Sequence, residues 1–316
     1  MSEVKHHLPL IANLVTAVIF GFAYMFIKMG MHVVDYDTVK FLAFRFTTGF
    51  IVLTLLLVLG FQKVNYRGKP VYLLLLVGTL NPLVSQVLET TATTYVPTSQ
   101  IAVFFSLSPI FIVMFSVLIN REIPTKRQVF FILVIILGLM IINFVDGHME
   151  GSTPLGVVLV FSASVVIALH RVLIRRASGS FTAFETIYIS TGMGAIAFSS
   201  TTLLTHAAQG RLGNFFDGLW TFDFVVSILY MGILSCVVAF LCLAYASANM
   251  PIAVSTATAK VASIISILVG TFILGETFRA IDVVGTIITF LGVVGVSLSY
   301  NASASNRFAV KKDASE

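Results

Sequence analysis

The chain has 316 residues, of which 58% are hydrophobic and only 10% are charged, and its formal net charge is +5. A soluble domain carries about 25% charged residues, so this composition excludes an ordinary soluble protein. The basic residues stand in short loops and at the chain ends, without interleaved aromatic residues, which argues against a nucleic-acid partner.

Long apolar stretches recur along the whole chain, and each has about the twenty residues that a helix needs to cross a bilayer. Backbone groups in lipid must be satisfied internally, so only helices or barrel strands can span it. The stretches are about twice as long as barrel strands and do not alternate. We therefore predict an all-α membrane protein with ten transmembrane helices, in chain order at residues 8–30, 37–60, 71–92, 97–119, 127–145, 153–174, 182–206, 222–246, 252–274 and 279–300.

Neither end of the chain and neither cysteine is predicted to belong to a functional site. The first stretch is too long for a signal peptide and lacks a clear cleavage site, so we expect it to remain a helix. Residues 301–316 are predicted to be a disordered tail. Cys236 and Cys242 lie in one apolar stretch without metal or disulfide spacing, so we expect no metal and no cofactor.

Lysine and arginine positions predict the orientation. With the N-terminus in the cytoplasm, the cytoplasmic segments hold twelve of these residues and the outer segments hold four. Cytoplasmic loops are enriched in basic residues. We therefore expect a multi-pass protein of the cell membrane with both termini in the cytoplasm.

An internal repeat is visible between the two halves. Residues 96–142 align without a gap to residues 250–296, at an offset of 154. The informative matches are those of proline, glutamate and glycine: Pro97 with Pro251, Glu122 with Glu276, and Gly138 with Gly292. We expect repeats at residues 1–148 and 149–300. Each would hold five helices, and an odd number inverts the second repeat, as in many transporters.

Short motifs give the sequence a resemblance to a known family. They are Ile19-Phe20-Gly21-Phe22-Ala23, Phe44-Arg45-Phe46 and Leu274-Gly275-Glu276, together with the glycines Gly138 and Gly292. With these the chain resembles the ten-helix EamA-type members of the drug/metabolite transporter superfamily over nearly all of residues 8–300. The resemblance implies transport of amino acids, metabolites or toxic compounds, by facilitated diffusion or by proton exchange.

Lys260 is the clearest candidate for contact with a substrate, because an ionisable group near the centre of a membrane helix is costly and usually functional. Thr256, Lys260 and Ser263 share one helical face. Ser106 occupies the position of Lys260 in the first repeat. The alternative is that Lys260 only pairs with a carboxylate, such as Glu89, or with backbone carbonyls.

The predicted third helix carries a second polar stripe. Asn81, Ser85 and Glu89 recur every four residues, and Gln86 is adjacent. We predict that these residues also line a substrate site, and a buried Glu89 could carry a proton. The alternative is that Glu89 lies near the outer interface, where a carboxylate costs little.

Two further ionisable residues have structural and functional interpretations. Arg45 could pair with carbonyls or with a carboxylate, or contact the substrate. His170 could be a satisfied polar contact or a proton relay. We expect purely structural roles for Glu122 and Glu276 before helix starts, for Pro97 and Pro251 at helix starts, and for Gly138 and Gly292.

Three classes of function compete. A membrane-embedded enzyme needs paired catalytic groups, and neither an HExxH motif nor an aspartate at the centre of a span is present. A receptor or structural protein does not need an inverted repeat, although homodimerisation remains open. A secondary transporter of a small molecule, such as an amino acid or an organic acid, fits best. Within transport, the alternative is a nucleotide-sugar or phosphorylated-sugar exchanger, for which we expect clustered basic residues in the late helices.

Overall fold

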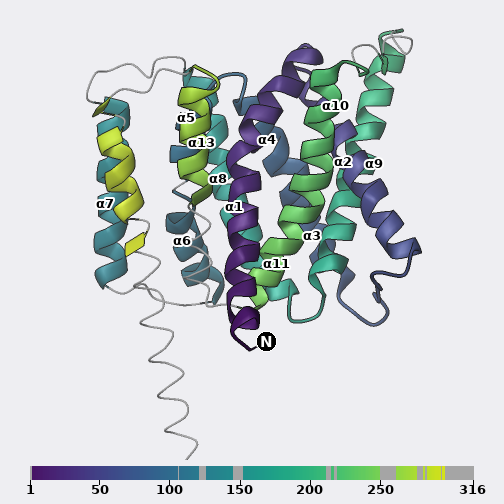
Figure 1. Cartoon of the computed structure of the whole chain (residues 1–316), viewed down its shortest axis with the longest axis horizontal. Helices are drawn as coiled ribbons and strands as arrows, with labels where there is room; N and C mark the ends of the chain where they lie inside the picture. The colour runs from purple at the N-terminus through teal and green to yellow at the C-terminus, as the bar shows by residue number, and fades with distance from the viewer. Residues whose placement is uncertain are drawn as a thin grey trace, which may run out of the picture.

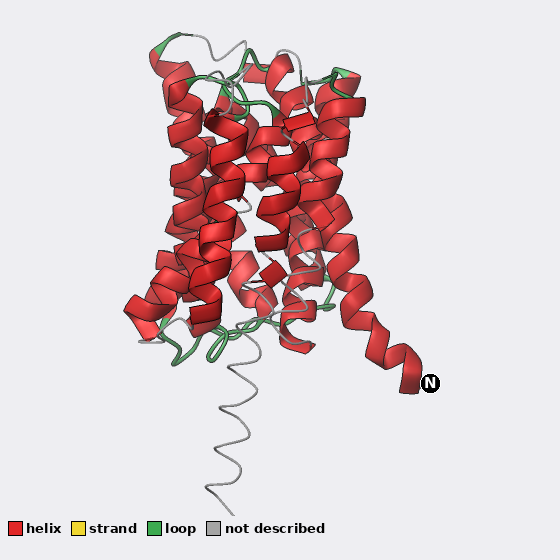
Figure 2. Cartoon of the chain, turned by 90° about the vertical axis from the view of Figure 1, so that its left-hand side faces the viewer, coloured by secondary structure: helices red, strands yellow, loops and turns green. Residues whose placement is uncertain are grey.

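The computed structural model describes residues 2–105, 107–120, 126–144, 152–210, 215–216, 219–249, 261–275, 280–281, 283–292 and 294–295. Over these residues the protein is a bundle of helices without a strand (Figures 1 and 2). The prediction of an all-α membrane protein is therefore confirmed.

Six helices in the described part are long and apolar enough to cross a membrane: Leu8–Val33, Thr38–Val58, Val71–Ala92, Pro154–Ile174, Ala183–Ala208 and Phe222–Leu243. Shorter apolar helices cover Ile110–Ile119, Val129–Gly138 and Val283–Gly292. All nine segments fall within predicted spans or within a few residues of them. Large apolar side chains cover the outer face, such as Ile196 and Leu204, each 70% exposed, as lipid contact requires.

The first half of the bundle contains α1 (Ser2–Val33), α2 (Thr38–Val58), α3 (Val71–Gly78), η1 (Thr79–Val84), α4 (Ser85–Ala92), α5 (Thr98–Phe105), α6 (Ser108–Asn120) and α7 (Lys126–Phe144). The second half contains α8 (Pro154–Ala177), α9 (Ala183–Ala208), α10 (Phe222–Leu229), η3 (Tyr230–Ala239), α11 (Phe240–Asn249) and α13 (Val261–Phe272). Side-chain caps begin several helices: Asp37 accepts from the Lys40 N–H, and Thr153 accepts from the Gly156 N–H.

Contacts between the halves follow the repeat. The first helix of the first half, α1, packs against α10, η3, α11 and α13, which are parts of the third and fourth helices of the second half. The equivalent helix α8 packs against α3, η1, α4, α5 and α6, which are parts of the third and fourth helices of the first half. The second helices, α2 and α9, pack against each other. This exchange of partners is the pattern that two repeats related by an approximate two-fold axis produce.

Two predicted spans are interrupted, which the apolar pattern does not reveal. The third span is not one continuous α-helix. It is interrupted by the π-helical segment η1, in which Asn81 has an extended backbone (φ −144°, ψ 114°). The proline that follows it, Pro82, cannot donate to the helix. The span predicted at residues 97–119 is likewise divided between α5 and α6.

Both halves carry their irregular helix at the same place. The offset of 154 that aligns the repeats carries Thr79–Val84 onto residues 233–238, inside the π-helical η3. It also carries Gly78 onto Gly232. Each glycine lies against the other repeat, since a Cβ at Gly78 would meet Met193 and one at Gly232 would meet Thr48.

Candidate functional site

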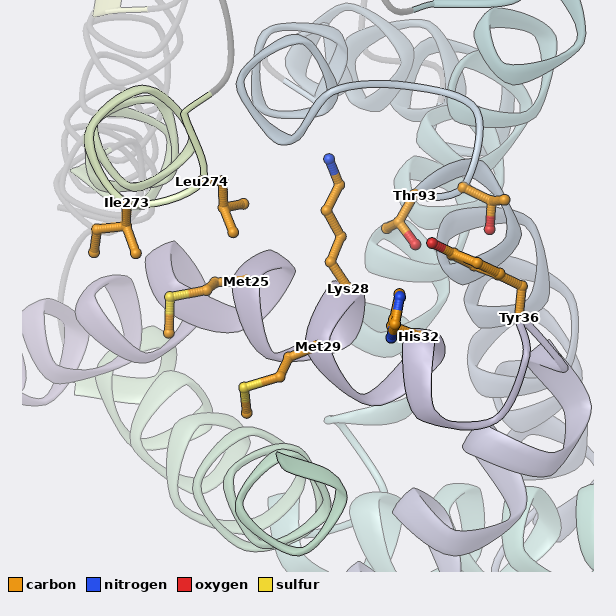
Figure 3. A pocket seen from close by; sticks show the side chains of 9 residues that line it. Met25, Lys28, Met29, His32, Tyr36, Thr93, Ile273 and Leu274 are labelled. Carbon is orange, nitrogen blue, oxygen red and sulfur yellow. The ribbon is translucent and has the colours of Figure 1, made fainter. Parts of the chain in front are cut away.

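A cavity of about 550 Å³ opens at the end of the bundle where α1 finishes, and we call it the vestibule. Its lining comes from α1 and the turn after it, from the turn after α4 and from the residues that directly follow α13 (Figure 3). The nine lining residues are Met25, Lys28, Met29, His32, Tyr36, Thr93, Thr94, Ile273 and Leu274. The vestibule therefore lies between a helix of the first repeat and a helix of the second.

The vestibule has one polar wall and one apolar wall. Lys28, His32 and Tyr36 follow one another at four-residue intervals from α1 into the turn after it, and Figure 3 shows the Lys28 ammonium extending into the space. The His32 and Tyr36 rings meet edge to face, with centroids 6.1 Å apart. On the facing side Ile273 and Leu274 present only hydrocarbon. Such a cavity suits a small molecule that combines polar groups with an apolar body.

A cluster of buried and half-buried polar side chains continues from the vestibule into the bundle. Tyr24 lies one helical turn below Lys28 on α1, and Glu89 lies one turn below Thr93. The Tyr24 hydroxyl interacts electrostatically with the Glu89 carboxylate. The polar path along the vestibule wall therefore leads to a carboxylate inside a membrane helix.

Gln86 joins this carboxylate to an arginine. Its Nε2 donates to Glu89 Oε2 at 3.1 Å, and its Oε1 accepts from Arg45 Nη1 at 2.6 Å. Arg45 Nη2 donates to Ser235 Oγ at 3.5 Å, and its guanidinium lies 5.3 Å from the centre of the Phe46 ring. Arg45 is only 4% exposed and Gln86 7%. We call Tyr24, Arg45, Gln86, Glu89 and Ser235 the polar cluster.

The polar cluster draws on both repeats. Tyr24 comes from α1, Arg45 from α2, and Gln86 and Glu89 from α4, whereas Ser235 comes from the π-helical segment η3 of the second repeat. Opposite charges on Arg45 and Glu89 balance each other, which lowers the cost of burying them. Among the described residues, no hydrogen-bond partner reaches Arg45 Nε or the buried hydroxyl of the neighbouring Ser85. The cluster can therefore offer hydrogen bonds to a ligand in addition to those it makes internally.

The structure describes only part of the predicted site. Gln86 and Glu89 belong to the polar cluster, Ser85 is buried beside it, and Asn81 stands at the break in η1. Lys260, Thr256 and Ser106 lie outside the described residues, and so does the side chain of Ser263. Their contact with a substrate stays a prediction, as does a pairing of Lys260 with Glu89, whose described partners are Gln86, Tyr24 and Arg45.

The residues with expected structural roles are also partly described. Pro97 directly precedes α5, and its carbonyl accepts from the Ile101 N–H. Gly138 and Gly292 lie at the crossing of α7 with the helix Val283–Gly292. His170 is buried on α8. Glu122, Glu276 and Pro251 lie outside the described residues.

Sequence reasoning missed Tyr24, Lys28, His32 and Ser235. Tyr24, Lys28 and His32 are four residues apart, which places them on one face of α1. This spacing could have predicted that they act together. Ser235 stands in an apolar run between Leu234 and Cys236 and carries no such signal. Only the packing of η3 on α2 brings it to Arg45.

Comparison with known proteins decides the family. The sequence model of the EamA-like transporter family matches residues 7–144 and again residues 154–298. The chain belongs to the EamA-like transporter family. As a member of this family it is a multi-pass membrane transporter of the drug/metabolite superfamily, and the double match agrees with its two repeats.

Two further comparisons give one protein that is similar in sequence and one that is similar in fold. The chain is 26% identical over 290 residues to the uncharacterized transporter YcxC of Bacillus subtilis (strain 168), a match that covers 92% of each chain. A protein of known crystal structure superposes on this chain with a TM-score of 0.58 at 15% identity. That match covers 94% of this chain and 97% of the other, and it shows a shared fold.

Proposed function

We propose that this EamA-family protein is a secondary transporter that exports a small metabolite, such as an amino acid or an organic acid, across the cell membrane. Transport would proceed by alternating access between inverted repeats at residues 1–148 and 149–300, with both termini in the cytoplasm. The observation that carries the proposal is the polar cluster, in which Arg45 and Glu89 lie inside membrane helices and Arg45 donates to Ser235 of the second repeat, with Glu89 one helical turn from Thr93 in the lining of the vestibule. Intramembrane charges of this kind mark substrate and ion pathways.

The chemistry of the site supports a substrate that carries both an acidic and a basic or hydroxyl group. Arg45 presents a planar guanidinium, which recognises a carboxylate through parallel hydrogen bonds. Glu89 accepts hydrogen bonds from ammonium or hydroxyl groups. The methionines Met25 and Met29 and the apolar wall of the vestibule accommodate an apolar body of variable shape.

The same wall argues against the alternative substrate, a nucleotide sugar or phosphorylated sugar. A phosphorylated ligand needs several basic groups around its phosphates. Of the described vestibule residues, Lys28 is the only lysine or arginine, and Ile273 and Leu274 face it with hydrocarbon.

A two-step experiment tests the proposal. Purified protein is first screened for thermal stabilisation by amino acids, organic acids, amines, nucleobases and phosphorylated sugars. The ligands that stabilise it are then tested for exchange in proteoliposomes loaded with the same radiolabelled ligand. We expect stabilisation and exchange with amino or organic acids, and a loss of both in Arg45→Met.

The matched control is Arg67→Met, which removes an exposed arginine at the other end of the bundle and should preserve exchange. Exchange of a phosphorylated sugar by the wild type, or undiminished exchange by Arg45→Met, would contradict the proposed substrate class.

A further inference from the structure

At the end of the bundle where α1 begins, which we call the N-terminal end, the two repeats are joined by an ion pair. The loop between α2 and α3 extends from the first repeat to the start of α9 in the second (Figure 1). Lys69 Nζ of this loop lies 2.8 Å from Glu185 Oε2 and 3.0 Å from Oε1. Glu185 is only 2% exposed, so the pair is shielded from water on the carboxylate side.

Further hydrogen bonds attach the same loop to the same residue. The Asn65 N–H donates to Glu185 Oε1 at 2.7 Å, and the Tyr66 hydroxyl donates to the Glu185 carbonyl at 3.1 Å. Burial raises the pKa of Tyr66 to about 12, so its hydroxyl keeps its proton at physiological pH. The Lys69 ammonium also lies 5.3 Å from the centre of the Phe181 ring. The loop therefore contacts α9 through charge, backbone and aromatic groups together.

This junction and the vestibule lie at opposite ends of the bundle. The vestibule opens where α1 finishes, and α2 returns antiparallel to α1 before the loop begins. In this conformation a cavity separates the repeats at one end, while Lys69 and Glu185 hold them together at the other. A transporter that alternates access must separate its repeats at the closed end when it opens there.

We infer that the Lys69–Glu185 pair is the latch that keeps the N-terminal end closed, and that it breaks when the protein opens toward that end. The inference rests on the proposed function, transport by alternating access. The pair contributes free energy only to the conformation in which it forms, so its removal shifts the population toward the other conformation.

Glu185 also has a local role that the test must separate from the latch. It forms a capping box with Thr182, accepting from the Thr182 N–H at 2.8 Å, while the Thr182 side chain accepts from the Glu185 N–H. Substitution of Glu185 would thus weaken the start of α9 as well as the ion pair. Lys69 takes no part in the capping box, so Lys69→Met removes the ion pair and the ammonium contact with the Phe181 ring but leaves the capping box in place.

The experiment measures the accessibility of single cysteines in a background that carries Cys236→Ala and Cys242→Ala. Met29→Cys reports on the vestibule, and Ala177→Cys reports on the buried cluster of Leu74, Ala177 and Phe181 at the N-terminal end. In Lys69→Met we expect maleimide labelling of Ala177→Cys to rise, and labelling of Met29→Cys to fall, each on the order of threefold or more. Lys69→Arg should behave as the wild type, because it keeps the charge.

Arg67→Met is the matched control, since it removes an exposed cation from the same loop, and it should leave both labelling rates unchanged. If Lys69→Met does not fold, Glu185→Gln replaces it, because its amide oxygen can still accept from the Thr182 N–H. Unchanged labelling of both reporters in a folded variant would overturn the latch. The assay needs no substrate, so a working latch without transport would disprove the proposed function, and transport with unchanged labelling would disprove the latch.

Discussion

Arg45 illustrates how one residue can depend on a whole network. Arg45 is 4% exposed and lies in a helix that is long and apolar enough to cross the membrane. An isolated charge there costs several kcal/mol. Gln86 and Ser235 supply hydrogen-bond acceptors, and Glu89 supplies the opposite charge. A substitution that removes one partner and leaves the other charged should therefore lower the stability of the protein.

Arg45→Met should therefore destabilise the protein more than the double variant Arg45→Met/Glu89→Gln. The single variant leaves the half-buried Glu89 carboxylate without its counter-charge, at a cost of up to about 3 kcal/mol, whereas the double variant leaves a neutral pair. Melting temperatures of both variants and of Glu89→Gln complete the cycle. A double variant no more stable than Arg45→Met would show that the two residues do not interact energetically.

Lys260 gives a second prediction at this scale, made from its sequence position. If its ammonium contacts the substrate, Lys260→Ala should abolish transport and leave the melting temperature nearly unchanged. Lys260→Arg should retain part of the activity, because a point charge and a planar fork bind a carboxylate differently. Exchange assays in proteoliposomes measure this. Normal exchange by Lys260→Ala, or a cationic substrate, would reduce the lysine to a pairing residue.

Single polar residues of the site can be predicted from the sequence, but their hydrogen-bond and ion-pair partners cannot. Arg45, Gln86 and Glu89 stand out because charged and amide groups are rare in apolar runs. Tyr24 does not, since an aromatic ring is ordinary in a membrane helix. The latch is similar: Thr182 and Glu185 show the spacing of a capping box, but nothing local points to Lys69, which lies 116 residues away.

Close approach of two helices depends on glycine at the crossing of α7 with Val283–Gly292. A Cβ on Gly138 would lie 2.7 Å from the Thr289 backbone nitrogen, and one on Gly292 would lie 2.9 Å from the Ile135 backbone nitrogen. Backbone atoms cannot move aside as a flexible side chain can. In lipid, such small-residue contacts replace the hydrophobic effect as the source of helix association.

Gly138→Leu should consequently separate the two helices and lower the melting temperature, by roughly 1–3 kcal/mol of stability as for other overpacked sites. Gly179→Ala is the control, because a Cβ there would meet only the Arg176 carbonyl at 3.6 Å. The melting temperatures of the two variants and of the wild type are compared by heating samples and measuring by size-exclusion chromatography the protein that remains folded. Equal melting temperatures for Gly138→Leu and the wild type would mean that the helices are not held at this distance.

Helix positions are the part of the fold that the sequence predicts best, because bilayer thickness sets a minimum length of about 20 apolar residues for a span. The interruptions are harder to predict. Asn81-Pro82 signals the break in η1, but the apolar sequence of η3 contains no proline and gives no warning. Its irregular backbone is instead supported by α1, where Thr16 Oγ1 donates to the Ala239 carbonyl at 3.1 Å.

Topology is a property of the whole molecule, and two exposed positions test it. Single cysteines at Arg67, in the loop of the latch, and at Tyr36, at the mouth of the vestibule, should react from opposite sides of the membrane. We expect an impermeant maleimide added to intact cells to label Tyr36→Cys and to label Arg67→Cys only after permeabilisation. The reverse pattern would invert the proposed orientation, and labelling of both in intact cells would refute the antiparallel arrangement of α1 and α2.

The matching irregular helices also bear on the origin of the molecule. Asn81 and Pro82 of η1 correspond to Ser235 and Cys236 of η3, so the residues that break the first helix are not those found in the second. Yet both helices depart from regular geometry at the same place, next to the equivalent glycines Gly78 and Gly232. A single ancestral half that already carried an irregular helix at this position, duplicated and fused to its own copy, accounts for both. The irregular helix geometry is thus retained in both repeats, although the residues at these positions have diverged.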